Sequence, residues 1–293
     1  MTVQVIPFEN LPKLMADLED LALSNNDVVF RGHRDETWKI ESTLARYTSI
    51  PHQSWDDHID KMLSHFIVNA LSIGTIPFPP ADRRSRLEYG RHYGVPTPLI
   101  DFSLSPYVAL YFAFGEVLYR HNPTASNSAA IYALNMSNLG VCWSKFLNGN
   151  FDEEYSKFMY EKTNIFKHGY PAGELKFMRF PASWNQRMQR QLGCFIYDTL
   201  DYNKIGFEGF EALIDSFEEP TSNGTRHPTL IKYLIPQTEA SGVFSRLELM
   251  NINGTKLIDS EGIAADVKSS YNYARKTGYA WDIELSPPDD TKM

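Results

Sequence analysis

The stretch Arg91–Ala113, RHYGVPTPLIDFSLSPYVALYFA, constrains the fold more than any other part of the chain. Ser105 followed by Pro106 is an N-cap serine before a proline at the first helical position, which predicts that a helix begins there. A short apolar strand comes before it, so Asp101 and Ser103 lie where a strand ends and a helix begins. Backbone N–H groups and the positive helix end converge at such a junction, which suits a phosphate or a carboxylate. A well-capped helix without any ligand explains the same residues equally well.

A second polar group follows an apolar segment near the N-terminus. Val28–Phe30 is predicted to be a buried strand, and it delivers Arg31, Gly32 and His33 at its end. A buried arginine is costly unless its guanidinium meets an anion or carbonyl oxygens. Arg31 therefore either caps a carboxylate inside the fold or binds a phosphate. Gly32 lets the backbone turn or lets a ligand come close.

Hydrophobic periodicity predicts helices and strands along the rest of the chain. The predicted extended segments are 3–6, 28–30, 38–40, 99–100, 129–134, 175–180, 194–197 and 230–235. The predicted helices are 10–23, 55–73, 82–89, 106–114, 207–217, 243–250 and 262–273, with a helical insertion near 141–170. Two amides, Gln189 and Gln191, come just before the 194–197 strand. They either bind the hydroxyl and amide groups of a ligand or pair with backbone groups.

The composition argues against several classes of protein. The 293 residues are 43% hydrophobic and carry a net charge of −8. That charge disfavours a bulk electrostatic grip on nucleic acid or on an anionic membrane, although a local basic patch still binds phosphate. Cys142 and Cys194 have no metal-like spacing, and no apolar run approaches the length that spans a bilayer. We therefore expect no signal peptide, no membrane partner and a reducing, cytoplasmic location.

Four motifs occur in an order that is typical of one family: Val28–His33, His92–Thr97, Leu99–Asp101 and Ser105–Ala113. Together they resemble the FRG domain family, which is named for a Phe/Tyr-Arg-Gly motif. Arg187 with Gln191–Phe195, and then residues 250–267, resemble later segments of that family. The resemblance spans about residues 25–275, and it implies a single FRG-like domain over residues 1–293.

The chain departs from the usual family pattern at three positions. The family commonly has Gln, Arg and Trp where this chain has Arg91, Pro98 and Phe102. The missing arginine at position 98 weakens any anion contact from that loop. Arg91 is a candidate to supply such a contact instead.

FRG domains resemble, more distantly, the ADP-ribosyltransferase fold. This implies an α+β fold with a split, mostly antiparallel sheet surrounded by helices, with NAD as a substrate and no metal. By this resemblance Arg31 holds a phosphate of NAD, and Ser103 bonds near the nicotinamide ribose. Tyr93, or another ring, stacks on nicotinamide. Gln189 or Gln191 holds ribose hydroxyls.

The resemblance implies a protein that splits the glycosidic bond of NAD, by transferring ADP-ribose to a macromolecular acceptor or by hydrolysis. In a bacterial setting it implies a toxin or an anti-phage effector. A glutamate in place of the late glutamine would stabilise positive charge and act as a base. His92 and Asp101 are the local candidates for acid or base, and they equally suit a role in fixing the turn. The predicted catalytic residues are Arg31, His92, Asp101 and Gln191; the predicted NAD-binding residues are Arg31, Gly32, His33, Tyr93, Ser103, Ser105, Gln189 and Gln191.

Two other classes of function compete with this enzyme. A non-catalytic module that binds a nucleotide or a nucleotide-modified partner needs Arg31 but not the chemistry, and the missing glutamate favours it. A nucleic-acid processing protein is the third class. The acidic balance and the lack of metal-type carboxylate clusters count against it.

Overall fold

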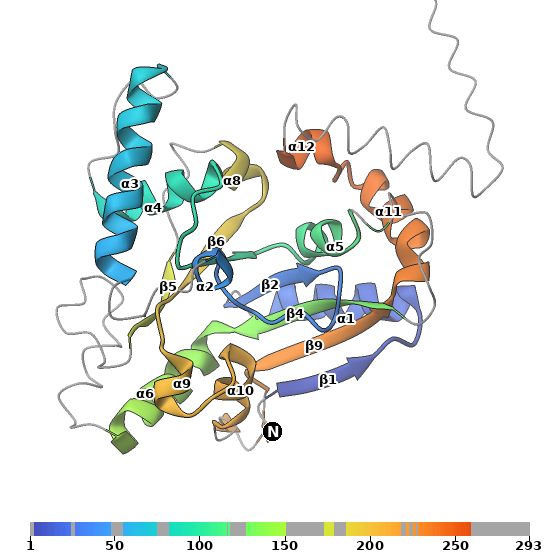
Figure 1. The fold of residues 1–293 in the computed structure, drawn as a ribbon. Coiled ribbons are helices and arrows are strands. Elements are labelled where there is room, and N and C mark those ends of the chain that lie inside the picture. Colours follow the sequence, from blue (N-terminus) through green and yellow to red (C-terminus); the bar gives the residue numbers. More distant parts are fainter. Residues whose placement is uncertain are drawn as a thin grey trace, which may run out of the picture.

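The computed structural model describes residues 3–24, 27–47, 55–74, 82–115, 117, 127–150, 173–178, 186–217, 221–222, 225–226 and 228–258. Strands and helices of these residues form an α+β fold around a seven-stranded sheet (Figure 1). The strands of this sheet are β1 (Val3–Pro7), β2 (Val28–His33), β3 (Leu99–Ser103), β4 (Ser128–Asn135), β5 (Leu175–Met178), β6 (Gly193–Asp198) and β9 (Leu230–Pro236). A separate pair is formed by β7 (Thr221–Ser222) and β8 (Thr225–Arg226).

The helices fall on both faces of the sheet. They are α1 (Leu11–Ser24), α2 (Thr43–Tyr47), α3 (Trp55–Ser72), α4 (Arg83–His92), α5 (Pro106–Phe114), α6 (Met136–Asn150), α8 (Gln186–Arg190), α9 (Tyr202–Ile205), α10 (Phe210–Asp215), α11 (Ala240–Leu249) and α12 (Gly254–Ile258), with a short 3₁₀ helix at Gln237–Glu239. None of the described helices is both long and apolar enough to span a membrane.

The strand order is β1-β9-β4-β2-β3-β6-β5, and only the β1–β9 pair is parallel. The predicted α+β class with a mostly antiparallel sheet is therefore confirmed. The β2–β4 ladder extends from Val28 to His33, whereas β2 and β3 pair only at Phe30 and Ser103. The sheet is thus split between β2 and β3 into a four-stranded and a three-stranded half.

Three apolar clusters hold the helices on the sheet. On one face of the four-stranded half, α1, α5 and α11 pack around residues such as Phe30 and Leu110. On the other face, α6 and α10 pack against Tyr132 and its neighbours. Helices α3 and α4 cover the three-stranded half around Phe195, and Figure 1 shows them at the opposite end of the molecule from α1 and α11. This arrangement leaves the split between the two halves as the place where polar groups gather.

The start of α5 is as predicted. Pro106 is its first residue, and Ser105 caps it by accepting a hydrogen bond from the backbone N–H of Val108 at 3.4 Å. The apolar pattern of this helix predicts that Val108, Ala109, Tyr111, Phe112 and Phe114 are buried, and all of them are except Phe112, which is exposed. Local cap chemistry is thus sufficient to place this element.

Several predicted elements differ from the structure in their extent or type, and others lie outside the described residues. Strand β2 continues through Arg31 to His33, so no turn occurs at Gly32. Residues 38–40 are not a strand, because Trp38 belongs to a loop between β2 and α2. The amide-rich segment before β6 forms the short helix α8. Helix α6 begins directly after β4, earlier than the predicted insertion, and residues 151–170 lie outside the described part, as does the helix predicted at 262–273.

Candidate functional site

A cleft of about 480 Å³ lies where β2 and β3 separate. Its lining comes from both of these strands and from α4, α5 and α8, with further side chains from α2 and the loop after β2. Of the residues predicted from sequence, it brings together Arg31, Gly32, His33, His92, Asp101, Ser103 and Gln191. These residues come from three distant parts of the chain, so the fold assembles them.

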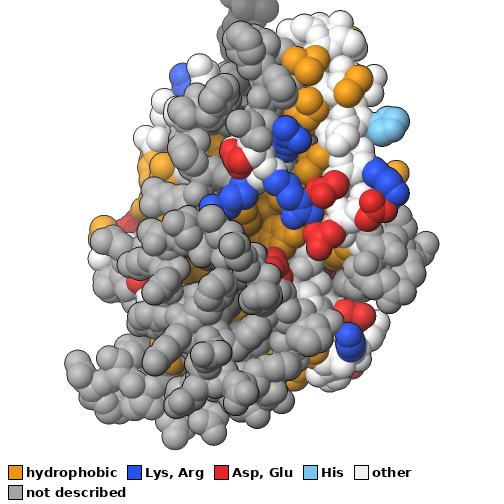
Figure 2. All heavy atoms as spheres, turned by 90° about the vertical axis from the view of Figure 1, so that its left-hand side faces the viewer, with side chains coloured by type: hydrophobic (Ala, Val, Ile, Leu, Met, Phe, Trp, Pro, Cys, Tyr) orange, Lys and Arg blue, Asp and Glu red, His pale blue; other side chains and the backbone are white. Residues whose placement is uncertain are grey.

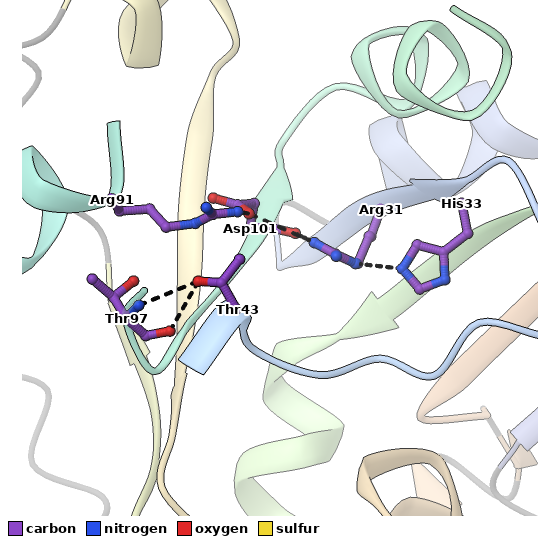
Figure 3. Close-up of polar contacts among 6 residues, drawn as sticks. All are labelled: Arg31, His33, Thr43, Arg91, Thr97 and Asp101. Atoms are coloured by element: carbon purple, nitrogen blue, oxygen red, sulfur yellow. Dashed lines mark hydrogen bonds and ion pairs between the residues drawn. The ribbon is translucent and has the colours of Figure 1, made fainter. Parts of the chain in front are cut away.

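Arg31 occupies the split itself. Its Nη1 donates to the backbone oxygen of Asp101 at 2.6 Å, and its Nε donates to Nε2 of His33 at 2.7 Å (Figure 3). Because the β2–β3 ladder has already ended at Phe30, the guanidinium takes the place of a backbone donor from β2. Burial lowers the pKa of Arg31 to about 10, so the guanidinium stays charged at neutral pH. Its two N–H groups on Nη2 have no hydrogen-bond partner among the described residues and are left for the cleft.

The carboxylate of Asp101 lies between two arginines. Nη2 of Arg91 contacts Oδ2 of Asp101 at 2.5 Å, and Nη1 of Arg31 is 3.9 Å from the same oxygen. Arg91 is the next-to-last residue of α4 and reaches Asp101 from the opposite side to Arg31 (Figure 3). Asp101 thus neutralises part of the positive charge of the cleft, and the structure pairs it with Arg91 rather than with His92.

His33 is buried and uncharged. Burial and the nearby charge of Arg31 lower its pKa to about 3. Its Nε2 accepts from Arg31, so the proton of the neutral ring sits on Nδ1, which faces the backbone oxygen of Trp38 at 3.2 Å. Both ring nitrogens are therefore used inside the protein.

A pair of threonines holds α2 against the loop that leads into β3. The hydroxyl of Thr43 accepts from the backbone N–H of Thr97 at 3.2 Å and donates to the Thr97 oxygen at 3.3 Å (Figure 3). This fixes the short helix that carries Arg46, whose side chain also lines the cleft. Arg46 is thereby the third arginine of the site.

The cleft carries an excess of positive charge. Its described lining holds four arginines, Arg31, Arg46, Arg91 and Arg187, against the two carboxylates Glu88 and Asp101. On the face that α3 covers, in contrast, basic and acidic side chains are interspersed around apolar atoms (Figure 2). There Arg83 contacts Asp56 at 2.8 Å and Asp60 at 2.7 Å. A net positive cleft in a chain of charge −8 favours an anionic ligand.

Ser103 and Gln191 form a contact between β3 and the turn before β6. The Ser103 hydroxyl donates to the backbone oxygen of Gln191 at 2.6 Å and accepts from the backbone N–H of Ser105 at 3.0 Å. The Gln191 amide donates to the backbone oxygen of Leu257, in α12, at 2.9 Å. Both side chains line the cleft while serving these internal bonds, so their predicted contacts with ribose stay predictions.

Three predicted ligand residues do not line the cleft. Ser105 caps α5 with its hydroxyl. Gln189 is exposed, and its backbone oxygen accepts from the N–H of Leu192 at 3.1 Å. Tyr93 is 48% exposed and packs with Phe66 and Tyr89 beside α3.

Gly32 lies in the cleft wall for a packing reason. A Cβ atom at this position would stand 1.9 Å from the backbone oxygen of Ala109 in α5. The absent side chain therefore lets α5 lie directly on β2. The group that approaches Gly32 closely is thus a helix of the same chain, whereas the sequence predicted a turn or a ligand there.

Several cleft residues were not among the predicted site residues, among them Trp38, Arg46, Glu88, Phe112 and Arg187. Glu88 precedes Arg91 and His92 by three and four positions, a helical spacing that puts all three on one face of α4. Trp38 and Phe112 are 39% and 42% exposed, and they give the cleft aromatic surface. All nine residues of α5 are apolar or aromatic, which is more than one buried face needs, and this excess is the signal that could have indicated an exposed ring such as Phe112.

Residues 26–121 match the model of the FRG domain. The chain contains an FRG domain. The match covers about one third of the chain, and it includes β2, α4, β3 and α5 with most of the cleft. No curated protein and no solved structure matches the chain. The likeness of this FRG domain to ADP-ribosyltransferases stays a prediction.

Metal ligands are not clustered in the described part of the site. Within the described ranges, no three His, Cys, Asp or Glu side chains are grouped so that they would hold a metal ion. Glu88 and Asp101 share the cleft with four arginines, a setting that suits anions.

Proposed function

We propose that the FRG domain binds NAD in this cleft and cleaves its nicotinamide–ribose bond. The observation that carries the proposal is the excess of arginine over carboxylate in a cleft that also exposes aromatic rings. A dinucleotide offers two phosphates to arginines and two planar rings to aromatic side chains. The cleft volume of about 480 Å³ lies in the range typical of small-molecule sites.

Cleavage of the nicotinamide–ribose bond is favoured by a negatively charged group near the ribose. When the glycosidic C–N bond breaks, both electrons leave with nicotinamide as a neutral base, and positive charge develops on the ribose. A carboxylate stabilises that charge and accepts the proton of the water or acceptor group that then attacks. Glu88 and Asp101 are the carboxylates that the described part of the cleft supplies. Gln191 carries no charge and takes no proton.

Release of nicotinamide, read by chromatography, tests the proposal. The wild-type protein is expected to release nicotinamide from NAD, and Arg31→Ala is expected to abolish release. Arg83→Ala is the matched control, because it removes an arginine that pairs with Asp56 and Asp60 outside the cleft. Release that survives in Arg31→Ala, or that is lost equally in both variants, contradicts the proposal.

One observation favours a second candidate, a module that binds the nucleotide without cleaving it. The late residue of the predicted motif is Gln191, and its amide already donates to Leu257. Such a module shows a rise of the melting temperature with NAD that Arg31→Ala removes, while no nicotinamide is released.

A further inference from the structure

We propose that His33 is a positioning residue which fixes the Arg31 guanidinium, so that Nη2 faces the cleft, and ties it to the loop that carries Trp38. The proposal rests on the proposed function, because it assigns how the anion-binding arginine of that site is aimed. The proposal is based on three consecutive contacts: the Asp101 oxygen with Arg31, Arg31 with His33, and His33 with the Trp38 oxygen.

The first step is the strand itself. Arg31 and His33 are two residues apart on β2, so their side chains lie on the same face of the sheet. The 2.7 Å bond from Nε of Arg31 to Nε2 of His33 fixes one edge of the guanidinium. The bond from Nη1 to the Asp101 oxygen fixes a second point. Two fixed points define the plane of the group and leave Nη2 for a ligand.

The second step is the protonation state of His33. A protonated imidazole would turn an N–H toward the Nε–H of Arg31, and two donors would then face each other. Arg31, Arg46 and Lys232 all add positive charge around the ring, and Tyr132 packs its ring against it at 5.1 Å. The contact with Arg31 therefore needs the neutral ring with its proton on Nδ1.

The third step is the loop after β2, which is firmly attached. The backbone N–H of Glu36 donates to the Ser128 oxygen at 3.0 Å, and Nζ of Lys232 donates to the Glu36 oxygen at 2.8 Å. The Gln237 amide donates to the Arg34 oxygen at 2.7 Å. The Trp38 oxygen that accepts the hydrogen bond from Nδ1–H is thus held in place. His33 is therefore held by a loop that is itself hydrogen-bonded to Ser128, Lys232 and Gln237.

The test uses one measurement that needs no ligand and one that does. Long-range ¹H–¹⁵N spectra of the full chain are expected to show His33 protonated on Nδ1 only, with no titration between pH 5 and 8. In His33→Phe, which keeps a ring beside Tyr132 but has no acceptor, the Nε–H signal of Arg31 is expected to shift. His33 found protonated on Nε2, or titrating near its usual pKa of 6.5, overturns the inference.

The second measurement is NAD affinity by calorimetry. We expect His33→Phe to weaken NAD binding by about tenfold or more, since a hydrogen bond to a charged group is lost. His33→Gln is expected to keep most of the affinity, because its amide oxygen accepts from Arg31. Equal affinity in wild type and His33→Phe overturns the inference. If the wild type binds no NAD, the proposed function fails, and the spectra alone decide the role of His33.

Discussion

Replacing Gly32 by alanine is the sharpest test of how the cleft wall is built. The new Cβ would stand 1.9 Å from the Ala109 oxygen and 2.8 Å from the Ala113 nitrogen. Both atoms belong to backbone, so no side-chain rotation relieves the contact. Helix α5 must retreat from β2 by about 1 Å to restore a normal contact distance.

The magnitude follows from the packing that this retreat disturbs. Helix α5 is almost wholly buried and contributes Val108, Leu110 and Phe114 to the largest apolar cluster. Overpacking costs about 1–3 kcal/mol even when side chains adjust. Because only backbone meets the new methyl group, we expect a loss of about 3 kcal/mol, which lowers the melting temperature by roughly 6–10 °C.

Gly140→Ala is the matched control for this change. Gly140 lies exposed in α6, and an added Cβ meets nothing within 4 Å. Removing a mid-helix glycine is expected to raise the unfolding free energy by about 0.5–1 kcal/mol. Thermal and denaturant unfolding of the two variants measures both effects. A Gly32→Ala protein as stable as wild type would refute the close packing of α5 on β2.

Three further predictions concern stability. Ser105→Ala removes the cap of α5 and is expected to lower the unfolding free energy by about 1 kcal/mol, as chemical denaturation will show. In the folded protein the pKa of His33 is about 3 instead of its usual 6.5, so the unfolding free energy falls as the pH drops from 6.5 towards 3. His33→Gln is expected to flatten this part of the curve of stability against pH. An unchanged curve would contradict the prediction. Burial raises the pKa of Asp198 from 3.8 to about 6, so the folded protein loses stability as the pH rises between those values and the carboxyl group ionises. Asp198→Asn is therefore expected to be more stable than wild type at pH 7 and to lose that advantage below pH 4. A difference in stability that does not change with pH would contradict the assignment.

Local chemistry allowed parts of the fold to be predicted. The Ser105–Pro106 start of α5 and the Asp82 start of α4 rest on capping side chains that are three residues from their partners. Strand β4 is buried at its six inner positions and β9 at four of its seven positions, and the apolar composition of both strands indicates them. Such elements depend on neighbours in the sequence, and the sequence displays those neighbours directly.

The environment of Arg31 could not be predicted in the same way. The sequence left a carboxylate and a phosphate as alternatives, and the structure shows that the oxygen it contacts most closely is the backbone oxygen of Asp101, seventy positions away. That contact exists because the β2–β3 ladder stops after one residue pair, which no local pattern encodes. Arg46 and Glu88 likewise enter the cleft from two separate helices, α2 and α4, whose positions depend on tertiary packing.

The sequence did not show which aromatic side chain reaches the cleft. The predicted stacking ring was Tyr93 or another ring; Tyr93 packs with Tyr89 and Phe66 and does not line the cleft, whereas Trp38 and Phe112 do. The two alternatives for the helix start were a capped helix and an anion site. Ser105 serves the cap, while the positive charge of the cleft comes from arginines on other elements.

The central claim is that the cleft around Arg31 binds NAD. Isothermal titration of NAD into the wild-type protein, Arg31→Ala and Arg83→Ala tests it most directly, since it requires no turnover. We predict binding to wild type and to Arg83→Ala, and none to Arg31→Ala. Absence of binding to the wild type, or binding by Arg31→Ala with wild-type affinity, would contradict the claim.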